Sequence, residues 1–254
     1  WQKKLESVVF LAGLGSMRDK ARRLERLCGL IAEMAGKPEV MLEASQAGGL
    51  AKVDLVSDMV GEFAELQGVM GGIYVRRKGQ SKSVSRAVAE QYLPAGPDSP
   101  VPPTLAGAIL SIADKADSLA GCFGLDMAPT GAADPYALRR AALGICRIVI
   151  EHGLRLDLME LLQAALDGYG DAKFKVDRTR VLARLLDFFG QRLKAYFTGR
   201  GFDTLVVEAA AGASFTDIAR LAARIDALAT FAAKPDFDQA VLTFKRAANI
   251  IRKQ

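Results

Sequence analysis

Several aspartates stand at spacings that would suit a divalent cation. Asp54 and Asp58 are one helical turn apart, and Asp114 and Asp117 lie three positions apart in a largely apolar stretch. Carboxylate oxygens are the ligands that hard divalent cations prefer. In the alternative interpretation these side chains lie on solvated helix faces, with Asp114 paired to an arginine or to backbone, because aspartates are seldom buried without a partner. We favour this structural alternative over a metal site.

Histidine chemistry has little support in the chain. His152 is the one histidine, and it stands at the end of a predicted helix with a glycine after it. Ser-His-Asp and Cys-His arrangements need a histidine base, whereas a histidine at a helix C-terminus commonly meets the helix dipole or solvent. The stretches GLGSMRDK and FTGRGF lack the order of a phosphate-binding loop, and no predicted strand precedes them. We therefore expect neither a histidine-based active site nor a nucleotide-binding loop.

Composition and charge restrict the class of protein. The 254 residues are half hydrophobic and a quarter charged, with a net charge of +5 and a pI near 9.1. This balance is typical of a globular protein, and the basic excess weakly favours a nucleic-acid partner. The three cysteines are too widely spaced for a disulfide framework or a metal clamp, and no apolar run reaches the roughly 18 residues of a membrane span. The first residue is Trp1 and no signal peptide follows, so we expect a cytoplasmic protein and a fragment of a longer chain.

Three groups of basic residues are candidates for contact with RNA phosphates, which dominate the affinity of proteins for RNA. They are Arg76, Arg77, Lys78 and Lys82 in a polar turn, Arg139 and Arg140 at the start of a helix, and Lys245, Arg246, Arg252 and Lys253 near the end. In the alternative interpretation the first group is a solvated charge run. For Arg139 and Arg140 the alternative is an ion pair with Asp114 or Asp117. Consecutive helix positions point about 100° apart, so one arginine can secure the fold while the other faces RNA.

Apolar residues recur at helical spacing nearly throughout, and no alternating stretch is long enough for a sheet, so we predict an all-α fold. Helices are expected over residues 17–36, 45–63, 81–93, 104–121, 134–153, 158–166, 178–202, 214–232 and 237–253. Loops are expected over 93–103 and 122–133, and residues 168–177 are the expected boundary between two packed units.

Local signals place several helix ends. Gly36 and Pro38 end the first long helix, Thr104 caps the buried one, and Asp134 with Pro135 forms the N-cap and first position of the next. The stretch LQGVMGGIYV contains three glycines, each costing roughly 1 kcal/mol against alanine in a helix interior. Close packing against another helix must therefore hold that stretch in place.

A longer pattern resembles a known family. The segments KVDLVSDMVGEFAELQGVMGGIYVRRKG, AVAEQYLP and LSIADKADSLAGCFGLDMAPTGAADPYALRRAALGICRIVIE, in this order and spacing, resemble the β subunit of the bacterial two-subunit glycyl-tRNA synthetase. The resemblance covers most of residues 22–151, and QAVLTFKRAANIIRK resembles the stretch that leads into that subunit's anticodon-binding domain. It implies that the large N-terminal half and the anticodon domain of the subunit are absent from this chain.

The resemblance implies an HD-like helical bundle over residues 1–172, followed by a smaller helical unit over 173–254. In hydrolytic members of the HD class, histidines and aspartates hold a metal ion. Here Val53 and Asp54 stand at the His-Asp pair and Asp114 at the later aspartate, while the histidines are missing. Two carboxylates without imidazole partners hold a cation only weakly, so we expect no metal and no catalytic residue in this chain.

The function implied is that of a noncatalytic, tRNA-binding part of glycine–tRNA ligase. Its expected partners are tRNA(Gly) and the α subunit, which would bind ATP and Mg²⁺ and activate glycine; no cofactor, membrane or DNA partner is expected for this chain. Two alternatives remain open at this stage. One is a helical module that docks the α subunit without touching RNA, and the other is an HD-type metal-dependent phosphohydrolase.

Overall fold

The computed structural model describes residues 1–251, leaving aside the side chains of residues 238 and 247–250. Its helices are α1 Met17–Met34, α2 Met41–Leu50, α3 Asp58–Glu62, α4 Val69–Arg77, α5 Lys82–Glu90, α6 Leu105–Gly124, α7 Leu138–Glu151, α8 Leu158–Asp167, α9 Arg178–Gly199, α10 Thr204–Ala213, α11 Ile218–Ala232 and α12 Phe237–Ile251. The described residues also contain four 3₁₀ turns. Turn η1 Lys4–Ser7 precedes α1, and η2 Pro38–Val40, η3 Val53–Val56 and η4 Ala64–Leu66 lie between successive helices from α1 to α4. The described residues contain no strand, which confirms the all-α prediction.

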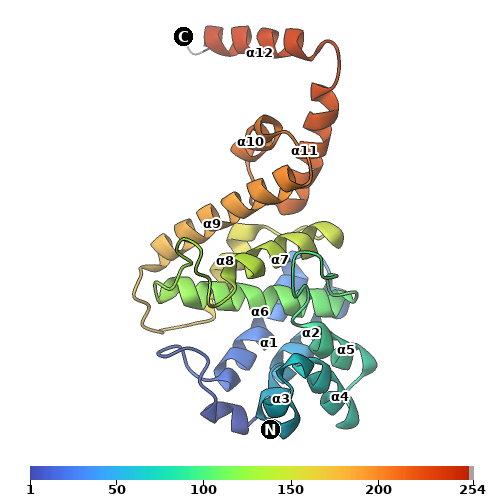
Figure 1. Cartoon of the computed structure of the whole chain (residues 1–254), viewed down its shortest axis with the longest axis vertical. Coiled ribbons are helices and arrows are strands. Elements are labelled where there is room, and N and C mark those ends of the chain that lie inside the picture. Colours follow the sequence, from blue (N-terminus) through green and yellow to red (C-terminus); the bar gives the residue numbers. More distant parts are fainter. Residues whose placement is uncertain (252–254) are drawn as a thin grey trace.

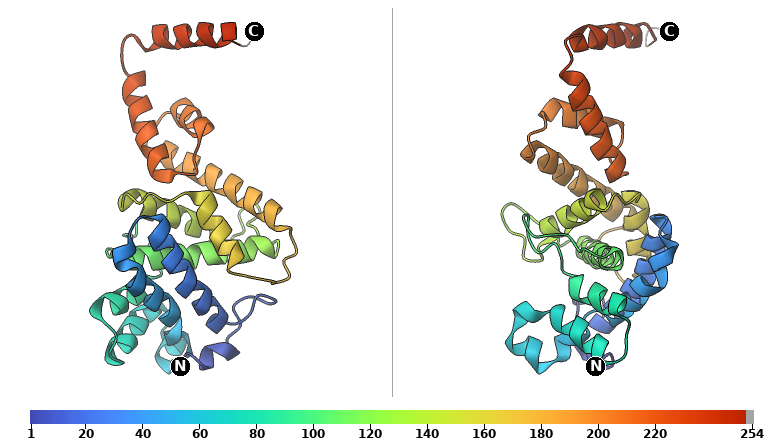
Figure 2. Two further views of the ribbon diagram at one scale, coloured as in Figure 1. Left: turned by 180° about the vertical axis from the view of Figure 1, so that it is seen from behind. Right: turned by 90° about the vertical axis from the view of Figure 1, so that its right-hand side faces the viewer.

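The molecule has a broad body and a narrow extension (Figure 1). Helices α1 to α8 form the body, α9 crosses one end of it, and α10 to α12 project away from it. The two side views in Figure 2 show the same extension, with α12 at its tip. No helix among the described residues has both the length and the apolar character of a membrane span.

Helix α6 is the centre of the body. It packs against α1, α2, α5, α7, α8 and α9, and nearly all of its residues are buried. The Thr104 hydroxyl accepts a hydrogen bond from the Gly107 amide at 3.1 Å, as predicted for an N-cap. A helix surrounded on all sides buries even its polar residues, so Asp114, Lys115 and Asp117 lie inside the protein.

Helix α1 confirms the first amphipathic prediction. Leu24, Cys28 and Ile31 are fully buried on one side of it, and the helix ends just before Gly36, whose φ of 64° lies in the left-handed region.

Cys28, Cys122 and Cys146 are free thiols.

The predicted helix over residues 45–63 is wrong. Helix α2 ends at Leu50, Lys52 takes a left-handed φ of 68°, and the chain continues through η3 into α3. A left-handed backbone costs a residue with a β-carbon roughly 1–2 kcal/mol. The break carries the Lys52 ammonium to the Asp114 carboxylate of α6, 2.7 Å away. A buried ion pair with a distant helix thus accompanies the break in the local pattern.

The glycines of α4 lie against α5, as expected. A β-carbon on Gly72 would lie 2.6 Å from the Ser85 carbonyl oxygen and 2.8 Å from the Ala89 β-carbon. The two short helices therefore approach so closely that only glycine fits at this position.

Two boundaries near α7 differ from the prediction. Residues 122–124 were expected in a loop but continue α6, and α7 begins at Leu138 rather than at Pro135. The Asp134 carboxylate does accept hydrogen bonds from free helix amides, those of Leu138 at 2.8 Å and Arg139 at 2.9 Å. Asp134 lies in a turn that precedes the helix. The left-handed φ of 53° at Ala137 interrupts the helical backbone between this turn and Leu138.

The C-terminal helices follow the predicted pattern with one addition. Helix α9 buries Val181, Leu185, Phe189, Leu193 and Phe197, and it packs against α6, α7 and α8. The short helix α10 was not predicted. The HD-like description of the body and the division at residues 172 and 173 stay predictions.

Candidate nucleic-acid interface

Asp114 belongs to a largely buried ion-pair network in which its carboxylate already has lysine partners. Its carboxylate lies 3.0 Å from the Lys20 Nζ and 2.7 Å from the Lys52 Nζ. Burial alone would raise the pKa of Asp114, but the ammonium groups of Lys20 and Lys52 hold that pKa well below its usual range. Lys52 also lies over the Tyr92 ring, 4.0 Å from its centroid. Two lysines thus supply the positive charge beside this carboxylate.

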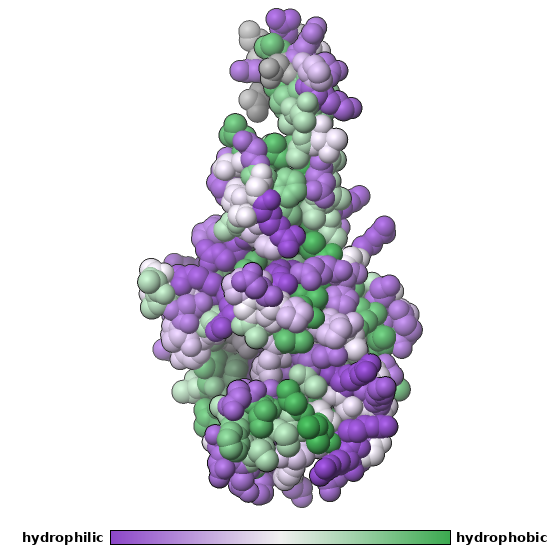
Figure 3. All heavy atoms as spheres, turned by 45° about the vertical axis from the view of Figure 1, so that its right-hand side comes forward, coloured by the Kyte–Doolittle hydropathy of each residue, from purple (hydrophilic) through white to green (hydrophobic). Residues whose placement is uncertain are grey.

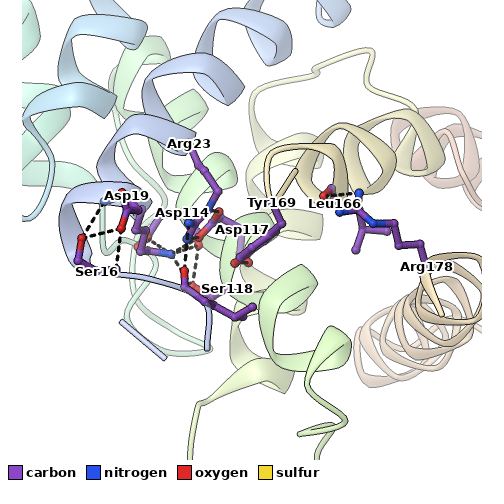
Figure 4. Close-up of polar contacts among 11 residues, drawn as sticks. Ser16, Asp19, Arg23, Asp114, Asp117, Ser118, Leu166, Tyr169 and Arg178 are labelled. Carbon is purple, nitrogen blue, oxygen red and sulfur yellow. Dashed lines mark hydrogen bonds and ion pairs between the residues drawn. The ribbon is translucent and has the colours of Figure 1, made fainter. Parts of the chain in front are cut away.

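Asp117 extends the network one turn along α6 (Figure 4). Its carboxylate lies 2.9 Å from the Lys20 Nζ and 2.6 Å from the Arg23 Nε, and the Arg23 guanidinium lies over the Tyr169 ring at 4.1 Å. The Tyr169 hydroxyl donates to the Asp117 carbonyl at 2.7 Å. Helices α1 and α6 and the loop after α8 are joined here by charge-assisted hydrogen bonds.

Asp54 and Val53 have separate structural roles. The Asp54 carboxylate accepts hydrogen bonds from the Gly68 amide at 2.6 Å and the Gly71 amide at 3.0 Å, at the start of α4. Val53 is buried in the hydrophobic core. Burial, and after it the negative charges of Asp114 and Asp54, raise the pKa of Tyr92. The two aspartates therefore have different partners, since Asp54 is bonded to backbone amides and Asp114 to ammonium groups.

The first basic group is fully on the surface. Arg76, Arg77, Lys78 and Lys82 are all exposed, at the end of α4 and the start of α5. Gly79, with a φ of 89°, makes the turn between the helices, and the Ser81 hydroxyl caps α5 by accepting from the Val84 amide at 3.1 Å. The turn and the cap fix a tight helical hairpin with exposed cations, of which Arg76 also donates to the Gln80 carbonyl oxygen at 2.7 Å.

Arg86 joins this group and was missed by the sequence reasoning. It is exposed, and it lines a groove of about 430 Å³ together with Arg76, Arg77, Val69 and Ile73. The sequence does contain the spacing that predicts this placement. Arg86 follows Lys82 by four positions, and residues four apart lie on the same face of a helix.

We call the set Arg76, Arg77, Lys78, Lys82 and Arg86 the basic hairpin. Among the described residues, none of the five lies within ion-pair distance of a carboxylate. The lower part of the molecule, where α3, α4 and α5 lie, shows an apolar patch beside hydrophilic side chains (Figure 3). The exposed apolar residues of this region are Met59, Phe63, Val69 and Ile73.

Arg139 and Arg140 do not pair with Asp114 or Asp117, so that alternative is wrong. Arg139 donates to the carbonyl oxygens of Gly131 and Ala133, and Arg140 donates to that of Ala95 at 3.2 Å. Lys20, Lys52 and Arg23 already bind the two acids. Arg139 therefore secures the turn before α7, while Arg140 remains exposed.

The other candidates are dispersed. Lys245 and Arg246 are exposed on α12, far from the body (Figure 1), whereas Arg252 and Lys253 lie outside the described residues. The His152 Nε2 lies 2.7 Å from the Pro102 carbonyl oxygen, which ties the end of α7 to the loop before α6. The structure thus brings the first basic group together and leaves the three groups separate from one another.

These features define an all-helical protein in which lysine and arginine neutralise the buried acids Asp114 and Asp117. Its α4–α5 hairpin presents cations that have no carboxylate partner among the described residues. The family model for the glycyl-tRNA synthetase beta subunit matches residues 1–212, and the chain belongs to that family. It is similar over all 254 residues to glycine–tRNA ligase beta subunits of Solidesulfovibrio magneticus, at 89% identity, and Oleidesulfovibrio alaskensis, at 59%. It is 45% identical over 98% of its length to that of Desulforamulus reducens. In each case the chain spans only 36% of the relative.

Proposed function

We propose that this chain is a tRNA-binding and structural part of a two-subunit glycine–tRNA ligase in the cytoplasm. Its relatives are named as beta subunits of glycine–tRNA ligase, which supports both an α-subunit partner and tRNA(Gly) as substrate. In this proposal the α subunit binds ATP and Mg²⁺ and activates glycine, and the present chain carries no catalytic residue. The basic hairpin, exposed and without a carboxylate partner, is the observation that carries the proposal.

The proposed contact is electrostatic. Arginine presents a planar fork of donors that matches a phosphate and can also stack on bases, and lysine adds a mobile point charge. Five such side chains on one hairpin offer a phosphate-binding surface. Its affinity should fall as the salt concentration rises, because the release of condensed counterions into concentrated salt is less favourable. Arg140 and the α12 pair Lys245 and Arg246 are further proposed contacts.

The test replaces Arg76, Arg77 and Lys78 with alanine in the complete α/β enzyme and measures tRNA(Gly) binding across a range of salt concentrations. We expect affinity to fall, and the salt dependence of log K to become shallower by about 0.7–0.9 for each phosphate that the variant no longer neutralises. Aminoacylation should weaken mainly through a higher KM for tRNA.

The matched control removes the same charge elsewhere. Arg155, Arg180 and Arg220 are exposed arginines on other surfaces of the chain, and their joint replacement by alanine should leave the salt slope nearly unchanged. Equal slopes for the parent enzyme and the hairpin variant would contradict the role of the hairpin in RNA contact.

A second candidate function rests on the apolar patch. Met59, Phe63, Val69 and Ile73 are each more than two-fifths exposed beside the hairpin, and exposed apolar patches commonly mark protein interfaces. In this version the region docks the α subunit without RNA contact. Replacing Met59 and Ile73 with serine would then weaken α-subunit association while tRNA binding of the assembled enzyme stays intact. Phosphohydrolysis is less well supported, because lysines already hold Asp114.

A further inference from the structure

Another cavity lies on the body, apart from the groove of the basic hairpin. Its volume is about 390 Å³, within the range of about 300–1,000 Å³ typical of small-ligand sites. It lies between η4, the loop after α5, α6 and the start of α7. Its polar lining includes the cations Lys115 and Arg140, the Asp114 carboxylate that Lys20 and Lys52 already bind, and Gln67, Tyr92, Ser118 and Tyr136. Glu65 also lines it and is exposed.

The residues that line and back the cavity include four cations and three buried acids, one of which, Asp114, itself lines the cavity. Asp114 and Asp117 are the carboxylates of the network, and the cations that surround them are Lys20, Arg23, Lys52 and Lys115. The third buried acid, Asp54, is already bonded to two backbone amides. Burying unmatched charge is costly, and an anion in the cavity would reduce that cost.

Lys115 is the member of this network that is not within ion-pair distance of a carboxylate among the described residues. Its ammonium donates to the Leu93 carbonyl at 2.8 Å and the Ser111 hydroxyl at 2.6 Å. An ammonium has three donors, so one remains. Gly144 leaves room for its stem, since a β-carbon there would lie 2.8 Å from the Lys115 Cε. The fold therefore positions a buried cation at the cavity wall.

The rim adds an aromatic ring and a second cation. Tyr136 is 45% exposed, and Arg140 is exposed with one hydrogen bond, to the Ala95 carbonyl. A guanidinium has five N–H donors, so most of those of Arg140 are available. Proteins that bind unpaired RNA bases commonly stack them on aromatic side chains and hold the backbone with cations.

We propose that this cavity binds a single unstacked nucleotide, with its phosphate on Lys115 and Arg140 and its base on the ring of Tyr136. This inference rests on the proposed role in RNA contact and names a second point of contact. Helix α4 starts directly after the cavity residue Gln67 and Gly68, and its nine residues span about 14 Å to the basic hairpin. One RNA can therefore meet both sites.

The experiment measures tRNA(Gly) binding to the complete α/β enzyme at several salt concentrations. Base stacking is worth about 1–3 kcal/mol, so Tyr136→Ala should weaken binding by about 5- to 100-fold with an unchanged salt slope. Tyr136→Phe should bind like the parent. Arg140→Ala should weaken binding and make the slope shallower, whereas the exposed control Arg155→Ala should do neither. Equal melting temperatures would show that the variants fold.

A second experiment tests whether the cavity binds a nucleotide of an RNA chain or a free nucleotide. Cytidine 5′-monophosphate is titrated into the parent enzyme and the Tyr136→Ala and Arg140→Ala variants. Loss of its binding in both variants, with tRNA affinity intact, would assign the cavity to a free nucleotide and overturn RNA as the source. No effect of either variant on either ligand would overturn the nucleotide site altogether. The basic hairpin variant still tests the proposed function independently, because it changes different residues.

Discussion

Replacing Lys52 with methionine tests whether the buried ion pairs determine the shape of the body. The change keeps a stem of similar length over the Tyr92 ring and removes the ammonium that lies 2.7 Å from Asp114. Breaking a buried pair typically costs about 3–5 kcal/mol, because the remaining charge is left unsatisfied. Asp114 would keep Lys20 at 3.0 Å, so we expect a smaller loss of about 2–3 kcal/mol.

The assay is urea unfolding of the 254-residue chain, followed by far-ultraviolet circular dichroism. With an m-value of about 3 kcal/mol per molar urea, the midpoint should fall by roughly 1 M. Lys173→Met, which changes an exposed lysine, should leave the midpoint nearly unchanged.

A double-mutant cycle isolates the pair itself. Lys52→Met combined with Asp114→Asn should be less damaging than the sum of the two single changes, with a coupling energy of about 1–3 kcal/mol. The pKa of Asp114 is depressed in the folded protein, so its stabilising contribution is complete above its ordinary pKa and is lost as the pH falls through the lower folded value. Lys52→Met should reduce that acid-dependent loss. Additive energies, or a Lys52→Met chain as stable as the parent, would refute the reasoning.

Three further perturbations test packing, proton linkage and loop anchoring. Gly72→Ala should destabilise the chain by about 1–3 kcal/mol in urea unfolding through its clash with α5, whereas Gly61→Ala, in open space within α3, should be neutral or stabilising. Burial lowers the pKa of Lys115 from 10.5 to about 8 in the folded protein. Between pH 8 and 10.5 the unfolded chain therefore binds more protons at Lys115 than the folded chain, and the free energy of unfolding should rise with pH. Lys115→Met should flatten that rise. Arg147 Nη1 donates to the carbonyls of Pro97 at 2.7 Å and Ser99 at 2.8 Å; Arg147→Ala should speed proteolysis of that loop, and an unchanged cleavage rate would count against the clamp.

Helical spacing predicted most helices because an amphipathic helix repeats its apolar residues locally. Helix α1 and helix α9 follow from their periodic leucines, and the Thr104 cap follows from its place before an apolar run. The basic hairpin was also predictable, since consecutive cations beside a glycine turn have no apolar face to bury. Arg86 needed only the four-residue spacing from Lys82.

The break at Lys52 and the pairing of the acids could not be derived in this way. Lys52 and Asp114 are 62 positions apart, and Lys20 and Asp117 are 97 apart, so no local window contains both partners. On a helical wheel Lys20 resembles any other cation on a polar face, yet it is 2% exposed because α6 lies against that face.

The sequence by itself determined the helical class, the family and the exposed cations of the α4–α5 turn, because each depends on residue order within short segments. Only the tertiary structure decided which cations are buried with Asp114 and Asp117, and that Arg139 and Arg140 bind backbone carbonyls instead. It also decided that Lys115, Tyr136 and Arg140 share one cavity. These outcomes depend on which distant helices pack together, and packing brings groups into contact that the sequence keeps apart.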